Sequence, residues 1–317
     1  MSSSTNISTR LKSKAVKAKA KNLGVYINLK TDFGFKRVFR IKKVMLKFLN
    51  AILNIEGGIT DLTYIDTEVL GLSKEDRKAV CDVICVTGNG EHIIVEMQSI
   101  GQEFFKDRTR LYMAMLIHQH AIKGRAKDGE YWNFKLPPVY VISFANFYLD
   151  KKEEEEAKAR AKAKKVSGKE AQETKIDEKY VSYIKYMDVK TNKIFIENET
   201  LVYIELPKFS KKLDEVKTVI EQWVYLVKNM HRLKKIPKKF TDEIFETVFE
   251  VAKLANMDKK DVYKYFKSLN DMNLVRNEIN SMKNTIATLK SNNTALQSNN
   301  TALQNENAEL RRRLGIN

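Results

Sequence analysis

The sequence is poor in cysteine, with Cys81 and Cys85 as the only two thiols among 317 residues. Both lie within one apolar run, so a disulfide framework is excluded and a reducing compartment fits best. Proline and glycine are also scarce, at 4 and 12 residues, which favours long helices over a loop-rich all-β fold. No run approaches the roughly 18 apolar residues of a membrane-spanning helix, and the first residues lack the apolar core of a secretory signal. We therefore expect a soluble cytoplasmic protein, nucleoid-associated if it is bacterial.

Acidic residues are outnumbered by basic ones, at 40 against 57, which gives a net charge of +17. Such a balance suits a polyanionic partner, because neutralised phosphates release counterions; a merely soluble basic protein is the alternative. We interpret residues 1–27 as a flexible basic arm that binds nucleic acid, although a solvated tail or a transit peptide has a similar composition. The first 31 residues contain no acidic residue and seven basic ones: Arg10, Lys12, Lys14, Lys17, Lys19, Lys21 and Lys30.

Helical periodicity is found in several parts of the chain. The spacing of apolar residues predicts one helix that starts at Thr31 or Asp32, continues through Asn50 and is ended by Gly57-Gly58. A second helix is predicted over residues 103–123, and residues 211–272 form a mainly helical region. Residues 151–176 are dense in Lys, Glu and Ala, which predicts a solvated helical insertion. The apolar face expected for the second helix consists of Phe104, Leu111, Met115 and Ile122.

Strand patterns separate these helices. The runs 79–87 and 91–98 flank Gly88-Asn89-Gly90, and two β-rich runs around such a turn indicate a hairpin. Further β-rich runs cover residues 60–71, 139–144, 180–189 and 193–206.

The C-terminal residues 273–317 carry a seven-residue period. Residues 291–297 are repeated identically as 298–304, and residues 305–311 form a degenerate third copy. This period predicts a coiled coil, with residues 275–314 joining a homodimer, although a polar low-complexity tail is the alternative. The d positions hold Val275, Met282, Leu289, Leu296, Leu303 and Leu310, and the a positions hold Ile279, Ile286, Asn293, Asn300, Asn307 and Leu314.

The hairpin carries the residues that point to chemistry. If its loop comprises the three residues 88–90, Asp82 lies directly across from Glu96, and the two side chains share one face. A two-residue loop would instead place Met97 across from Asp82 and send the carboxylates to opposite faces. Two carboxylates that close repel each other unless a divalent cation lies between them. Hard cations such as Mg²⁺ or Mn²⁺ take oxygen ligands, so the three-residue loop predicts a metal site.

These motifs resemble a known family. Asp82, followed after thirteen residues by Glu96-Met97-Gln98, is similar to the Asp…Glu-x-Lys signature of PD-(D/E)XK nucleases, with Gln in place of Lys. Together with Thr31-Asp-Phe-Gly-Phe-Lys36 and Arg108-x-x-x-Tyr112, it resembles the Rpn-like recombination-promoting nucleases, which are often labelled transposases. The resemblance covers about residues 28–230. It implies an α/β fold with a mixed β-sheet flanked by helices, in a nuclease-like domain over residues 28–210, and Mg²⁺-dependent hydrolysis of DNA phosphodiesters.

The resemblance also implies roles for individual residues. Asp82 and Glu96 would ligate the metal, with the backbone carbonyl of Met97 as a third ligand. Gln98 would take the catalytic place of the lysine, but it brings no positive charge, so stabilisation of the transition state would pass to another cation. Asp32 is a candidate for a further metal ligand, although helix capping explains it equally well. The candidates for contact with DNA are Lys36, Arg108 and Tyr112; a salt bridge from Arg108 and a packed Tyr112 are the alternatives.

Three functions therefore compete. The first is a metal-dependent DNA endonuclease, linked to recombination or to mobile elements. The second is a catalytically inert DNA-binding or regulatory protein built on a nuclease fold. The third is an interaction protein that acts through its coiled coil. Cleavage of supercoiled plasmid in the presence of Mg²⁺ or of a chelator distinguishes the first from the other two.

Overall fold

The structure is a computed structural model that describes residues 24–65, 68–69, 79–123, 134–167 and 179–316. These residues fall into two compact units, one that ends at Ser268 and one that begins at Leu269. Most of the expected basic arm, residues 1–27, and the end of the insertion 151–176 lie outside the described residues.

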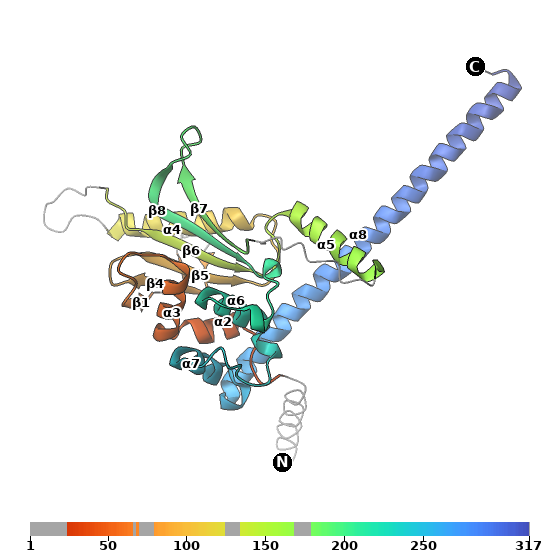
Figure 1. Cartoon of the computed structure of the whole chain (residues 1–317). Helices are drawn as coiled ribbons and strands as arrows, with labels where there is room; N and C mark the ends of the chain where they lie inside the picture. Colours follow the sequence, from red (N-terminus) through yellow and green to blue (C-terminus); the bar gives the residue numbers. More distant parts are fainter. Residues whose placement is uncertain (1–23, 66–67, 70–78, 124–133, 168–178, 317) are drawn as a thin grey trace, which may run out of the picture. The chain divides into compact units, whose positions relative to one another are not determined.

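The first unit is built on a mixed sheet of six strands in the order β1-β4-β5-β6-β8-β7 (Figure 1). The strands β5, β6 and β8 run parallel, whereas β1, β4 and β7 each lie antiparallel to their neighbours. Two short strands, β2 and β3, pair separately. The bounds are β1 Leu62–Tyr64, β2 Glu68–Val69, β3 Ala79–Val80, β4 Val83–Thr87, β5 His92–Gln98, β6 Val139–Ala145, β7 Val181–Met187 and β8 Ile194–Glu205.

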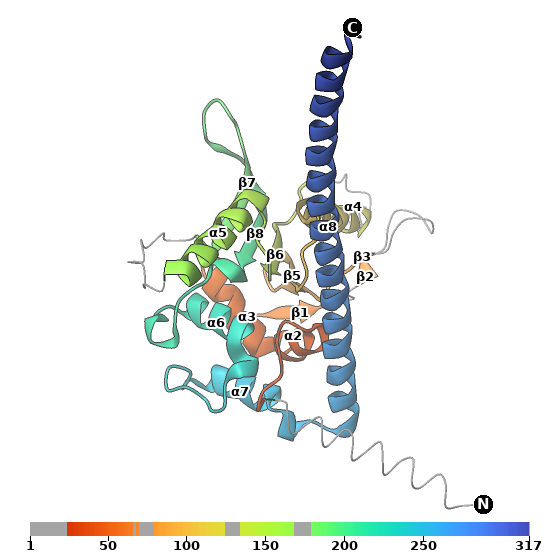
Figure 2. The same cartoon turned by 90° about the vertical axis from the view of Figure 1, so that its right-hand side faces the viewer.

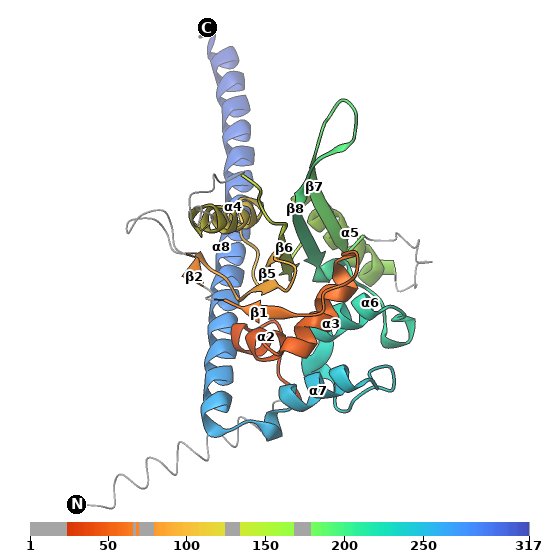
Figure 3. The same cartoon turned by 90° about the vertical axis from the view of Figure 1, so that its left-hand side faces the viewer.

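Helices cover both faces of this sheet (Figure 3). One face packs against α4 (Phe105–Lys123), whose buried residues join apolar side chains of β4, β5, β6 and β8. On the other face lie α2 (Asp32–Phe39), α3 (Lys42–Ile52), α6 (Val219–Asn229) and α7 (Glu243–Ala252), which Figure 2 shows side by side. Aromatic rings fill this second layer: Phe144 of β6 contacts the rings of Phe35, Phe39 and Phe48, and the last two also contact Trp223. The expected mixed sheet flanked by helices is confirmed.

Two helices differ from the prediction. The single helix expected from residue 31 up to Gly57-Gly58 is interrupted at Arg40-Ile41 and ends at Ile52, and Thr31, not Asp32, caps its first part. The face expected to be buried in helix 103–123 is wrong at Phe104 and Leu111, which are 69% and 50% exposed, whereas Met115 is partly buried against the core and the side chain of Ile122 lies outside the described part. The buried side chains of α4 are instead Phe105, Thr109, Tyr112, Met113 and Leu116.

The second unit is one helix. It is the continuation, from Leu269, of α8 (Lys259–Leu314), and it runs without a break through the whole predicted heptad region. The helical conformation of this region is thereby confirmed, while its association into a coiled coil stays a prediction. None of the helices among the described residues is long and apolar enough to cross a membrane.

Candidate active site

The hairpin of β4 and β5 has the register expected from a three-residue loop. Val83 pairs with Val95 and Val86 pairs with His92, and Gly90 in the loop has a positive φ of 92°. Extending this register by one residue beyond Val83 places Asp82 across from Glu96. The alternative with a two-residue loop is therefore wrong.

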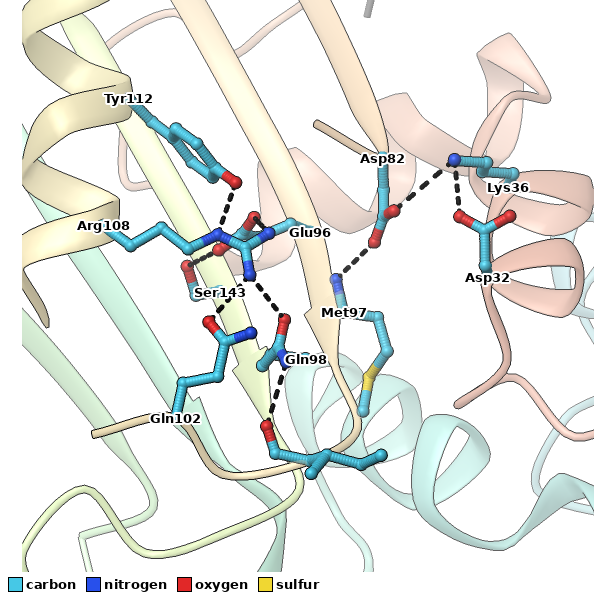
Figure 4. A network of polar contacts seen from close by, with 11 residues as sticks. Asp32, Lys36, Asp82, Glu96, Met97, Gln98, Gln102, Arg108, Tyr112 and Ser143 are labelled. Atoms are coloured by element: carbon cyan, nitrogen blue, oxygen red, sulfur yellow. Dashed lines mark hydrogen bonds and ion pairs between the residues drawn. The ribbon is translucent and has the colours of Figure 1, made fainter. Parts of the chain in front are cut away.

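The strand expected over residues 79–87 is nevertheless interrupted next to Asp82. β4 begins only at Val83, and Asp82 lies in a bend. Cys81 packs in the same cluster as Ile84, although strict alternation would put these two side chains on opposite faces. Regular alternation along residues 79–87, which would put Cys81 on the face opposite Ile84, is therefore broken at this point. As a consequence, Asp82 is directed by the bend and not by alternation, and its Oδ2 accepts a hydrogen bond from the N–H of Met97 at 2.8 Å. Its carboxylate meets Lys36 of α2, whereas Glu96 meets Arg108 of α4 (Figure 4), so the single shared face expected for Asp82 and Glu96 is not observed.

This hydrogen bond also indicates where the Met97 carbonyl points. Within a strand, the N–H and C=O of one residue point to the same neighbouring strand. Since the N–H of Met97 points to Asp82, its carbonyl oxygen lies on that side of β5 too. The carbonyl of the next residue, Gln98, points to the opposite side of β5. There it accepts a hydrogen bond from the N–H of Asn146, which comes directly after β6. Asp82 and the Met97 carbonyl therefore line the same edge of β5.

Glu96 is buried on the α4 face of the sheet, with 3% of its surface exposed. Its Oε1 accepts a hydrogen bond from Oγ of Ser143 at 3.3 Å, and its Oε2 lies 3.8 Å from Nη2 of Arg108. Burial raises the pKa of Glu96 to about 7; Arg108 opposes this rise and the charge of Asp82 adds to it. Ser143 was missed in the sequence, although a serine inside the apolar run Val139–Ala145 is a signal that could have indicated it.

Asp82 has a cationic partner of its own. Nζ of Lys36 lies 3.7 Å from Oδ1 of Asp82 and 2.5 Å from Oδ1 of Asp32. Burial raises the pKa of Asp82 to about 6, against the lowering effects of the Met97 N–H and of Lys36. Asp32 is mostly exposed, and its carboxylate pairs with Lys36 within the first turn of α2.

The motif around Thr31 explains how α2 holds Lys36 in place. Oγ1 of Thr31 accepts the N–H of Gly34 at 3.1 Å and donates to the carbonyl of Asn28 at 2.7 Å, so one hydroxyl caps the helix and fixes the preceding turn. Gly34 has no room for a side chain, because a Cβ there would collide with the Asn28 carbonyl oxygen. Phe35 is fully buried, and Lys36 therefore emerges from an anchored turn.

The side chains of Gln98 and Arg108 are joined by a hydrogen bond (Figure 4). Nη1 of Arg108 donates to Oε1 of Gln98 at 3.1 Å and to Oε1 of Gln102 at 2.9 Å, and its Nε donates to the hydroxyl of Tyr112. Nε2 of Gln98 donates to the carbonyl of Ile100 at 2.9 Å. Alternation along β5 puts Glu96 and Gln98 on one face, and both side chains meet Arg108. Tyr112 is buried, as expected if it packs in the core and does not contact DNA. This burial raises its pKa to about 12.

Oxygen ligands of the kind found near this end of β5 suit a hard cation. Among the described residues no group of three or more His, Cys, Asp or Glu side chains is arranged to hold a metal ion. The candidate set is smaller and mixed: two carboxylates, Asp82 and Glu96, and the main-chain oxygen of Met97. A site with so few protein ligands is typical of Mg²⁺, which keeps several waters and binds substrate phosphates.

The sequence as a whole identifies the family. The sequence model of PD-(D/E)XK nuclease family transposases matches residues 29–173 and 165–281. The chain belongs to this family. No curated protein and no solved structure matches it. The resemblance inferred from the motifs is thus confirmed at the level of the family, whose members are nucleases or transposase-related proteins, and the matched residues include every candidate site residue from Asp32 to Tyr112.

Proposed function

We propose that this PD-(D/E)XK protein is a divalent-metal-dependent DNA endonuclease that uses Asp82, Glu96 and the Met97 carbonyl as metal ligands. The observation that supports this most is a pair of carboxylates at the same end of one hairpin, the partly buried Asp82 and the buried Glu96, whose pKa values are raised to about 6 and about 7. Burial of two such groups is unfavourable without a cation. A divalent ion would stabilise both in their ionised forms.

The surrounding residues have separate proposed roles. The ion, when bound, would act as a Lewis acid on the scissile phosphate. Arg108 would supply the positive charge that Gln98 lacks, because its guanidinium adjoins both Glu96 and Gln98. Gln98 would orient Arg108 through its amide oxygen. Lys36 would hold Asp82 in position, and Asp32 would hold Lys36, so we do not assign Asp32 as a ligand.

Plasmid cleavage tests this proposal. Purified protein is incubated with supercoiled plasmid in Mg²⁺, in Mn²⁺ or with a chelator, and nicked product is quantified. We expect cleavage only with metal, and a loss of more than about 100-fold in Asp82→Asn and Glu96→Gln, because ligands contribute more than the residues that merely orient them. Glu103→Gln is the matched control, since Glu103 is an exposed carboxylate just before α4.

The possible outcomes separate the competing functions. Wild-type cleavage at the same rate in Asp82→Asn would show that the assigned centre is wrong. Tight DNA binding without any cleavage in either metal would establish the inert DNA-binding protein. We further propose that cleavage serves recombination or the movement of a genetic element, in keeping with the description of the family as transposases.

A further inference from the structure

A row of exposed apolar side chains runs along the second unit. The six d positions are 44 to 63% exposed, and they recur every seven residues on one helix. Leucine exposed at this spacing over about 60 Å of helix is unfavourable in water and fits a partner helix of the same period. The residues are Val275, Met282, Leu289, Leu296, Leu303 and Leu310.

We propose that residues 275–314 bind the same segment of a second copy of the chain, as a parallel, in-register, two-stranded coiled coil. The proposal rests on the side chains of α8 alone and is independent of nuclease activity. Orientation, number of strands and register each follow from a different set of these side chains.

The asparagines at a positions favour two parallel strands. In a parallel pair each a residue faces the a residue of its partner, so Asn293, Asn300 and Asn307 would each face their own counterpart and pair their amides. In an antiparallel pair a residues face d residues, and the same amides would lie against leucine without a partner. A buried asparagine at a also lowers the stability of assemblies with more than two strands.

The charges beside the seam favour the parallel orientation too. In a parallel pair a g residue faces the e residue five positions further along the partner. Glu278 would then face Lys283 of the second copy, and Glu306 would face Arg311, which gives two attractive pairs on each side of the seam. An antiparallel pair brings e positions together instead, and these are largely basic: Arg276, Lys283, Lys290 and Arg311.

The ends of the helix determine the register. Because residues 291–297 and 298–304 are identical, a slip of one heptad still places asparagine on asparagine in the middle of the seam. The same slip puts Ile286 against Asn293 of the partner and Asn307 against Leu314. It also separates Glu306 from Arg311. Only the in-register pair therefore keeps the asparagine pairs in the middle of the seam together with the apolar contacts and ion pairs at both ends.

Light scattering on the full-length chain tests the number of strands. We expect the mass of two copies at micromolar concentration. The double variant Leu296→Asp/Leu303→Asp places charge on the seam and should be monomeric. Its matched control, Ser298→Asp/Asn305→Asp, adds the same charge at two outward f positions and should remain dimeric. A monomeric wild type, or a mass of three or four copies, would overturn the proposal.

Cysteine cross-linking tests the orientation and the register. A cysteine at Leu310 meets its counterpart only in the parallel, in-register pair; a slip of one heptad separates the two thiols by about 10 Å, and an antiparallel pair separates them much further. We expect mild oxidant to convert Leu310→Cys into a covalent dimer, and to leave Asn305→Cys, at an f position, uncross-linked. The native Cys81 and Cys85 are buried, and the wild type serves as their control. A dimer by mass that does not cross-link through Leu310→Cys contradicts the assigned orientation.

Discussion

At position 98 an amide stands where the Asp…Glu-x-Lys signature has an ammonium group, and a guanidinium from another element lies next to it. Arg108 reaches Gln98 from α4, at 3.1 Å, and approaches Glu96 at 3.8 Å. A lysine at 98 and an arginine at 108 would compete for the same space and repel each other. The positive charge of the site has, in this interpretation, moved from the strand to the helix.

Exchanging the two side chains tests that interpretation. Arg108→Gln should lower cleavage at least tenfold, and Gln98→Lys/Arg108→Gln should recover part of it, because the double variant returns one cation to the site. Gln98→Lys alone should lower the free energy of unfolding by about 1–2 kcal/mol, since Arg108 loses a hydrogen-bond acceptor and gains a like charge. Nicking rates and urea unfolding measure both effects. No recovery in a folded double variant would mean that Arg108 does not act through its charge.

The raised pKa values predict a pH dependence of stability. In the folded, metal-free protein, Asp82 and Glu96 hold protons up to about pH 6 and 7, whereas in the unfolded chain they release them near pH 4. The folded state therefore binds more protons in this window, and the contribution of this pair to stability falls as the pH rises from about 4 to 7. Other carboxylates act in the opposite sense; the pKa of Asp61, for example, is lowered by its hydrogen bond to Lys42.

Comparison with Glu96→Gln isolates the contribution of the site. The variant cannot ionise, so in chelator its melting temperature should exceed that of the wild type by a few degrees at pH 8 and by less at pH 5. Added Mg²⁺ should stabilise the wild type more at pH 8 than at pH 5, because metal ligands must be deprotonated. Equal melting temperatures at both pH values would show that Glu96 is not held in an unfavourable environment.

Among the elements, the β4–β5 hairpin was the most predictable. Its existence follows from the two β-rich runs around Gly88-Asn89-Gly90, and its register follows once the loop is taken as three residues, because one residue fewer would turn the side chains of one strand to the other face. The bend at Asp82 was not predictable, since Cys81 and Val83 are equally compatible with either face. The buried face of α4 was wrong for a similar reason: apolar residues lie on two sides of this helix, and only the position of the sheet decides which side is covered.

The start of α2 allows a test of how this element supports the site. Gly34→Ala should lower the free energy of unfolding by about 1–3 kcal/mol, because the new Cβ would meet the Asn28 carbonyl and Thr31 Oγ1, and the backbone must shift. Gly88→Ala is the matched control, because its Cβ would make only an ordinary contact, 3.6 Å from Cβ of Asp61. Urea unfolding measures both variants. Equal losses would show that the close approach at Gly34 is not important.

At the scale of the molecule, α8 begins as part of the first unit. The hydroxyl of Tyr265 accepts the N–H of Asn28 at 3.0 Å, and Asp261 pairs with Arg37 at 2.5 Å. The start of α8 therefore supports the turn and the helix that carry Lys36. The sequence did not indicate this, because its periodicity describes the heptads and not the ten residues before Leu269.

Two truncations distinguish these parts of α8. A chain that ends at Leu274 keeps Asp261 and Tyr265, so it should remain folded and nick plasmid, but as a monomer it should yield few linear products. A chain that ends at Asp258 loses both contacts and should be markedly less stable. Gel analysis of nicked and linear plasmid, with thermal unfolding as the control for folding, measures the outcome. Linear product from the first truncation at the wild-type rate would contradict a role for dimerisation in double-strand cleavage.

The unbroken helix over the identical copies has a consequence for how the gene can change. Gain or loss of one seven-residue copy alters the helix length by about 10 Å and returns every later leucine to nearly the same side. An insertion of one residue instead turns all later side chains by about 100° and removes them from the row. Length variation in this segment among natural variants is therefore expected to occur in whole copies, so that the helix is lengthened or shortened in steps of fixed size.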